Sequence, residues 1–268
     1  MRILAIDSSG LVASVALLED DVLLGEYSTN FHKTHSATLL PMIDELFGML
    51  SLDIAHLCID AVAIAKGPGS FTGLRIGAAA AKGLSLSLDV PIIPVSSLAG
   101  MAYSFVGSAY KAVPLMDARR NETYCAVYSF CGLEMNEEIA PKACGISKII
   151  SELNALGGSA VFSGDGVPVF AETINNECAL PFIFAPAHTN RQRAASLGAL
   201  AMYMAKKDES AMIDGDDFVP EYMSAAIADA NPETVTRLTV PGASHAMSYF
   251  VDTKTYLETV DKFIKRTM

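Results

Sequence analysis

Three short segments contain residue types that could support chemistry, and the first is Asp7-Ser8-Ser9-Gly10. It follows an apolar run that predicts a buried strand, and a carboxylate at a strand end can hold a metal beside a phosphate. A working phosphate turn would also need further glycine or threonine and a nearby basic or amide side chain, whereas Leu11, Val12 and Ala13 follow here. The favoured interpretation of Asp7, Ser8 and Ser9 is a structural turn, with a degenerate phosphate turn as the alternative.

The second segment, residues 67–73, has the sequence Gly-Pro-Gly-Ser-Phe-Thr-Gly and lies between a predicted strand and a predicted helix. Free N–H groups at such a helix start can cradle an anion. The segment lacks the Lys that completes a Walker phosphate loop. It also lacks a glycine two residues after Ser70, so it is not the nucleophile elbow of a hydrolase. A tight turn and a functional surface both remain open.

The third segment contains His32 and His35. A zinc site needs a third clear ligand and groups that orient the ligands. The remaining histidines stand in unrelated contexts, at His56, His188 and His245. We therefore predict no metal site and no catalytic residues, and we assign no cofactor to the chain.

The helix after the glycine-rich segment has a small residue at every fourth position, namely Gly73, Gly77, Ala81 and Ser85. Small side chains at this spacing let another backbone approach closely. Glycine costs about 1 kcal/mol relative to alanine inside a helix, so close packing is expected to offset the cost of Gly77. The packing partner is either the chain's own sheet or another protein, and the sequence leaves both open.

The composition favours a soluble, cytoplasmic protein with a sizeable core. The chain has 268 residues, 51% of them apolar, and no apolar run that predicts a signal peptide or a membrane span. The odd number of cysteines, five, suits reduced thiols. A formal net charge of −11 argues against binding a nucleic acid unaided, because phosphate contacts need clustered Lys and Arg. Solvated surface charges are the favoured interpretation of the only tight arginine clusters, Arg119, Arg120, Arg191 and Arg193.

The hydrophobic pattern predicts the same order of elements twice. In the first half, helix spacing begins at His35, with an apolar side made by Leu39, Leu40, Ile43, Leu46, Phe47 and Leu50. Strands are predicted before it over residues 2–8, 12–18 and 22–28, and a strand, a helix and a strand follow over 58–65, 74–88 and 90–95. The second half is predicted to have strands over 112–116, 123–130, 134–140 and 159–163, and helices over 146–156 and 191–207.

This doubled βββαβα order is typical of the α/β fold of actin-like ATPases (ASKHA, ribonuclease H-like), in which two halves face each other across a cleft. We therefore expect an N-terminal subdomain over residues 1–105, a C-terminal subdomain over 106–223 and an atypical tail over 224–268. The fold class by itself does not define an activity.

Several segments together make a family resemblance. They are residues 3–9 (ILAIDSS), 35–46 (HSATLLPMIDEL), 67–77 (GPGSFTGLRIG), 91–98 (PIIPVSSL) and 116–128 (MDARRNETYCAVY). On these segments the chain resembles the TsaB family, historically labelled glycoprotease homologues, over about residues 1–223.

The resemblance implies a non-catalytic scaffold that binds TsaD, the relative that transfers the threonylcarbamoyl group to tRNA. It also implies a TsaE-like ATPase in the complex, a homodimer when the chain is alone, and contact with tRNA only through the complex, with ATP and metal on the partner subunits. The interface is expected on two helices, at His35, Leu39, Leu40, Ile43, Leu46, Phe47, Thr72, Gly73, Leu74, Gly77, Ala78, Ala81, Lys82 and Ser85.

One departure from the family is the tail. Members usually end soon after a segment that is matched here by residues 220–224, whereas this sequence continues to Met268. A strand over 235–240, a loop with His245 and an amphipathic helix over 255–265 resemble the end of an α/β-hydrolase. An orphaned tail is favoured over an active triad, because no nucleophile motif precedes His245. The alternative functions are an ATP-dependent small-molecule kinase, a hydrolase using His245 and a peptidase.

Overall fold

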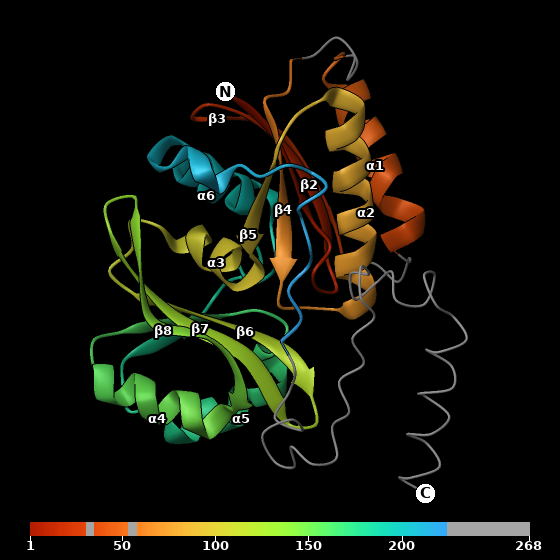
Figure 1. Cartoon of the computed structure of the whole chain (residues 1–268). Helices are drawn as coiled ribbons and strands as arrows, with labels where there is room; N and C mark the ends of the chain where they lie inside the picture. Colours follow the sequence, from red (N-terminus) through yellow and green to blue (C-terminus); the bar gives the residue numbers. More distant parts are fainter. Residues whose placement is uncertain (31–34, 53–57, 224–268) are drawn as a thin grey trace, which may run out of the picture. The chain divides into compact units, whose positions relative to one another are not determined.

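The computed structural model describes residues 1–30, 35–52 and 58–223 (Figure 1). The chain divides into a compact unit over Met1–Met223 and a second unit over Ser224–Met268. The predicted elements of the tail, with His245, His32 and His56, lie outside the described residues. No helix of the described part combines the length and hydropathy needed to cross a membrane.

The first sheet has the strand order β3-β2-β1-β4-β5. Its central strand β1 pairs antiparallel with β2 and parallel with β4. The residues of β1, β2 and β4 are nearly all buried, which explains their continuous apolar sequences, because helices cover both faces of the sheet. The strand bounds are β1 Arg2–Asp7, β2 Ala13–Glu19, β3 Val22–Thr29, β4 Ala61–Gly67 and β5 Ile92–Ser96.

Two layers of helices sandwich this sheet. On one face α1 (His35–Met49) and α2 (Phe71–Leu88) lie side by side (Figure 1). They pack on alternate residues of β1, including Leu4 and Ile6. On the other face α6 (Ala194–Lys207) packs on Ile3 and Ala5, and α3 (Ser97–Ala102) belongs to the same apolar cluster.

The second sheet repeats the first, with the strand order β10-β9-β6-β7-β8. Its central strand β6 pairs antiparallel with β7 and parallel with β9. Helices α4 (Ile146–Leu156) and α5 (Val167–Glu177) contribute to the apolar cluster on one face. The strand bounds are β6 Lys111–Arg119, β7 Glu122–Cys131, β8 Glu134–Gly145, β9 Ala160–Ser163 and β10 Phe182–Phe184, and short 3₁₀ turns are η1 Tyr103–Phe105 and η2 Glu209–Ala211.

These two sheets confirm the predicted actin-like α/β fold, and each half is longer than predicted, with the order βββαβαβα. Three elements were not predicted, namely the short α3 and β10, and α5, whose buried apolar residues are Phe170 and Ile174. The weak strand predicted over 134–140 is the long strand β8.

The packing of the chain does not follow the predicted boundary between the two subdomains at residue 105. Helix α6 falls in the segment 106–223, yet its residues Leu197 and Ala201 pack with the first sheet. Residues after α6 return to the same sheet, where Ile213 forms an isolated antiparallel bridge with Ile92 of β5. The first half is therefore completed by the last described part of the chain.

Candidate functional site

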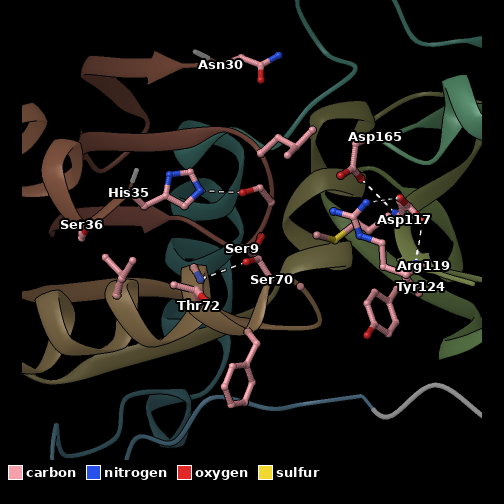
Figure 2. A pocket seen from close by; sticks show the side chains of 18 residues that line it. Ser9, Asn30, His35, Ser36, Ser70, Thr72, Asp117, Arg119, Tyr124 and Asp165 are labelled. Carbon is pink, nitrogen blue, oxygen red and sulfur yellow. Dashed lines mark hydrogen bonds and ion pairs between the residues drawn. The ribbon is translucent and has the colours of Figure 1, made fainter. Parts of the chain in front are cut away.

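A cleft of about 750 Å³ lies where the ends of β1 and β6 face each other (Figure 2). The first half contributes the turn after β1, the start of α1 and the start of α2, and the second half contributes the ends of β6 and β9. Among the side chains that line the cleft, those of the first half are Ser9, Leu11, Asn30, His35, Ser36, Ser70, Phe71, Thr72 and Ile76. Those of the second half are Met116, Asp117, Arg119, Tyr124 and Asp165.

The turn after β1 is closed by its own side chains. Asp7 is only 1% exposed, and its Oδ1 atom accepts hydrogen bonds from the backbone N–H of Ser9 at 2.9 Å and the Ser9 hydroxyl at 2.6 Å. Burial raises the pKa of Asp7 to about 6, although these hydrogen bonds and the nearby His35 partly oppose that shift. This geometry supports the structural interpretation of residues Asp7, Ser8 and Ser9.

The glycine-rich segment packs directly on that turn. The backbone N–H of Ser70 donates to the Ser9 carbonyl at 2.7 Å, and the Ser8 hydroxyl donates to the Gly73 carbonyl at 2.9 Å. A Cβ atom at Gly69 or Gly73 would lie 2.2 or 2.1 Å from a backbone oxygen of the turn. Glycine is required at both positions because two backbones touch here. Ser70 is the N-cap of α2, and its hydroxyl accepts from the Gly73 N–H at 3.2 Å.

The stripe of small residues on α2 corrects one prediction. Gly73, Gly77, Ala81 and Ser85 are all buried within the chain. A Cβ atom at Gly77 would lie 2.4 Å from the Ser8 hydroxyl and 3.1 Å from a methyl group of Ile64. The backbone that approaches this stripe is therefore the chain's own sheet, and these four residues are not available to a partner surface.

Most other residues predicted for the interface are buried for the same reason. A helix on a sheet turns its apolar stripe to the sheet, so the stripe found in the sequence is the core side of α1 and α2. The residues affected are Leu39, Ile43, Leu46, Phe47, Leu74 and Ala78. Leu40 and Thr72 remain exposed, Lys82 is half-buried and donates to the Asp216 carbonyl at 3.1 Å, and the Nε2 atom of half-buried His35 lies 2.8 Å from the Gly10 carbonyl oxygen.

The opposite wall of the cleft repeats the turn at Asp7. Asp117 lies near the end of β6, the central strand of the second sheet, and its Oδ1 atom accepts from the Arg119 N–H at 2.9 Å. The Asp117 N–H donates to Asp165 at 3.3 Å, and burial raises the pKa of Asp165. Sequence reasoning missed Asp117 and Asp165 as site residues, although an Asp at the equivalent strand end was a usable signal once the repeat was recognised.

The arginine clusters have different environments. Arg119 and Arg120 lie exposed at the tip of the β6–β7 hairpin, as predicted for solvated charges. Arg191 instead donates to the Gly164 carbonyl at 2.9 Å, and Arg193 forms an ion pair with Glu26 of β3. The interpretation as solvated charges is therefore wrong for Arg191 and Arg193, which connect the loop before α6 to its surroundings.

The walls of the cleft limit the chemistry that it can support. Asp7 is buried beneath the turn, is held by Ser9 and does not line the cleft. The carboxyl groups that do line it, Asp117 and Asp165, both belong to the wall made by the second half. Across the described ranges, no group of three or more His, Cys, Asp or Glu side chains is placed to hold a metal ion. The cleft offers polar groups for binding a small molecule, with Tyr124 and Arg119 at one wall and His35 at the other (Figure 2).

Two sheets of equal strand order around a cleft, with a closed turn at Asp7, define a member of the actin-like class. A structure from Pseudomonas aeruginosa, described as an uncharacterized protein with similarity to peptidase YeaZ, has the same fold. The TM-score is 0.71 at 24% identity, with 83% of this chain and 99% of that chain covered.

The family model of TsaD, described as tRNA N6-adenosine threonylcarbamoyltransferase, matches residues 26–231. The tRNA threonylcarbamoyladenosine biosynthesis protein TsaB of Bacillus subtilis is 30% identical over 232 residues, which cover 86% of this chain and 97% of that protein. TsaB of Haemophilus influenzae is 36% identical over 57% of this chain and 68% of its own length. The chain belongs to the TsaB family, within the wider family that the TsaD model describes.

Proposed function

We propose that this chain is a non-catalytic binding subunit in the formation of N6-threonylcarbamoyladenosine in tRNA, and that it binds a TsaD-like protein through the exposed side of α1 and α2. Its relatives are named as biosynthesis proteins of threonylcarbamoyladenosine. The observation that carries the proposal is the apolar character of this exposed helix surface.

The exposed side of the two helices has large apolar side chains in contact with solvent. Leu86 is 84% exposed, Leu40 57% and Phe71 50%, and Ala79 and Gly83 are exposed between them on α2. Helix α2 contains no acidic residue, although the net charge of the chain is −11. Exposed apolar surface of this kind marks sites of protein association. We call Leu40, Phe71, Ala79, Gly83 and Leu86 the helix face.

An aromatic cluster borders the helix face at the start of α2. The guanidinium carbon of Arg75 lies 3.7 Å from the ring centroid of Phe71, and Arg75 Nε donates to the Tyr222 hydroxyl at 3.2 Å. The rings of Phe71 and Tyr222 are 5.0 Å apart. Arginine and aromatic residues dominate binding energy in protein interfaces, and here they are already ordered before a partner binds.

The closed turn supports a binding role over an ATPase role. The Oδ1 atom of Asp7 is committed to Ser9, and the segment 69–73 lies against the turn that would otherwise receive a phosphate. The proposal therefore assigns ATP and metal to partner subunits. It includes a TsaE-like ATPase as a second partner, a homodimer of the free chain through the helix face, and contact with tRNA only through the complex.

Light scattering after size-exclusion chromatography tests the proposal on the full chain, alone and mixed with a TsaD-like protein of the same source. The test variant is Leu86→Glu, which introduces a charge on the helix face without touching the core. The matched control is Val169→Glu on α5, where a 58% exposed apolar side chain is replaced in the same way. We expect Leu86→Glu to lose both the complex and the homodimer, and Val169→Glu to keep both.

Two results would contradict the proposal. One is the absence of a complex with the wild-type chain, and the other is equal binding by Leu86→Glu and wild type. Turnover of ATP by the purified chain alone, abolished by Asp7→Asn, would instead favour the kinase alternative.

A further inference from the structure

Strands β7 and β8 bring two thiols into contact inside the second sheet. The Sγ atoms of Cys125 and Cys144 are 3.5 Å apart. In the strand register Cys125 is opposite Lys142 and Cys144 is opposite Thr123, so the cysteines are diagonal neighbours on one face. Both side chains are buried in the apolar cluster that includes residues of α4 and α5.

We propose that Cys125 and Cys144 form a redox modification site, at which a peroxide joins the two thiols as an intrachain disulfide between β7 and β8. The sulfur atoms would have to approach from 3.5 Å to about 2.05 Å. Closing this distance needs rotation of both side chains together with a local approach of β7 and β8, because diagonal neighbours on adjacent strands lie farther apart than a disulfide usually spans.

The reaction balances with hydrogen peroxide as the oxidant. The Cys144 sulfur attacks one peroxide oxygen, the O–O bond breaks, and Cys144 becomes a sulfenic acid while one water leaves. The Cys125 sulfur then attacks the Cys144 sulfur and displaces the hydroxyl group as a second water. Two thiols and one peroxide thus give one disulfide and two waters, with both sulfurs oxidised and both peroxide oxygens reduced.

Hydrogen bonding and charge set the order of the two cysteines. A hydrogen bond from the Cys125 thiol lowers the pKa of Cys144, and the same contact, with burial, raises the pKa of Cys125. The ammonium group of Lys142 also favours the Cys144 thiolate, whereas the Glu152 carboxylate, which forms an ion pair with Lys142, opposes it. Because Cys144 is also the more exposed of the two and lies on the edge strand, we assign Cys144 as the attacking thiolate and Cys125 as the resolving thiol.

The position of Cys144 gives the oxidant a route. Cys144 is 7% exposed and lies next to the exposed Gly145 at the end of β8. Strand β8 is the edge strand of its sheet, and edge strands open locally at lower free energy than central strands. Brief opening at this end exposes Cys144 before Cys125, which lies on the neighbouring inner strand.

The experiment uses the full chain with only the pair retained, after replacement of Cys58, Cys131 and Cys178 by serine. The chain is treated with hydrogen peroxide under native conditions, then unfolded and titrated for free thiols, and its peptides are analysed by mass spectrometry. We expect both thiols to disappear together, a single linked pair of peptides, and full recovery of both thiols with dithiothreitol. Peptide analysis of the oxidised wild-type chain checks that the same pair is linked when all five cysteines are present.

Two matched variants separate the roles. In Cys125→Ser we expect no disulfide and a Cys144 sulfenic acid that a 1,3-dione reagent traps. In Cys144→Ser we expect the remaining thiol to react at least about tenfold more slowly. The proposal is overturned if both thiols survive treatment, if Cys144 proceeds to sulfinic acid in the presence of Cys125, or if the link forms only at denaturant concentrations that unfold the chain.

Discussion

The two halves of the molecule share one strand order but present different helix surfaces. Helices α1 and α2 of the first half correspond to α4 and α5 of the second. The first pair exposes four large apolar side chains, Leu40, Met49, Phe71 and Leu86, beside the acidic residues Asp44 and Glu45 of α1. The second pair exposes two, Leu156 and Val169, among mainly polar residues, namely Ser147, Lys148, Ser151, Glu172, Asn175, Asn176 and Glu177. Two copies of one architecture thus carry helix surfaces of different character, and the first is the one that we propose for partner binding.

The turns at the central strands differ in a related way. Asp7 ends β1, Asp117 lies two residues before the end of the equivalent strand β6, and each accepts a hydrogen bond from the N–H two residues later. The first turn is covered by the start of α2 and is buried, whereas Asp117 remains partly exposed at the cleft. Because α2 packs closely on the turn after β1, it covers that turn, and the other side of the helix faces solvent.

The largest expected effect comes from breaking that close packing. Gly77→Leu places a side chain against Ser8 and Ile64, where even a Cβ atom lies 2.4 Å from the Ser8 hydroxyl. We expect a loss of about 3 kcal/mol or more in the free energy of unfolding, measured by urea denaturation.

Gly83 on the same helix is the matched control, because a Cβ atom there meets nothing within 4 Å. Gly83→Leu should keep or raise stability, since leucine is the better helix former by roughly 0.8 kcal/mol. Equal destabilisation by both substitutions would show that α2 does not pack on its sheet in the way described.

A second prediction compares the buried carboxyl groups of the two halves. Burial raises the pKa of Asp7 from 3.8 to about 6, so the folded chain binds more protons than the unfolded chain between these values. The free energy of unfolding therefore falls as pH rises from about 4 to about 6. Asp7→Asn keeps the Oδ1 acceptor and removes the charge, and should raise stability at pH 7 by up to about 3 kcal/mol.

Asp165→Asn provides the comparison in the second half. Its pKa is raised in the same direction by burial, but Asp165 is only half-buried, so the gain in stability should be smaller. Denaturation curves at several pH values measure both effects. If Asp7→Asn kept the wild-type dependence of the unfolding free energy on pH, this would contradict the assignment of that dependence to Asp7.

Much of this fold could be predicted because apolar periodicity is a local property of the chain. The bounds of α4 match the prediction, α1 ends one residue earlier than predicted, and β2 is shifted by one residue at both ends. The exposed interface residues could not be predicted in the same way. The stripe at Gly73, Gly77 and Ala81 signals a close approach, yet the sequence does not reveal whether the approaching backbone is the chain's own sheet or another protein. That depends on β1 and β4, which lie beside α2 only after folding.

The sequence also hid which individual residues of the two halves correspond, although it predicted the repeated order of elements. Gly67 and Gly164 end equivalent strands, each with positive φ and a backbone oxygen within 2.2 Å of the Cβ position. The residues around them differ, so the equivalence appears only once the two sheets are compared.

A third, smaller effect concerns the last described residues of the chain, which return to the first half at Tyr222. Tyr222→Ala removes the ring that packs on Phe71 and the hydroxyl that accepts from Arg75. We expect a loss of about 1–2 kcal/mol in the free energy of unfolding. Tyr222→Phe keeps the ring and should lose about 0.5–1 kcal/mol, since only the hydrogen bond is removed. Equal losses in the two variants would show that the ring contact contributes nothing.

The smallest effect is expected from deletion of residues 224–268. The three clusters of buried apolar residues extend from Ile3 to Phe218, so the fragment 1–223 retains every one of them. Both sheets and their covering helices are also complete in this fragment. We therefore expect the midpoint of thermal unfolding to stay within about 2 °C of the full chain, because a change that spares the core shifts stability by about 0.5 kcal/mol or less. A large fall in the midpoint would mean that the first 223 residues depend on the tail for their stability, and that the equivalence of the two halves does not by itself account for the fold.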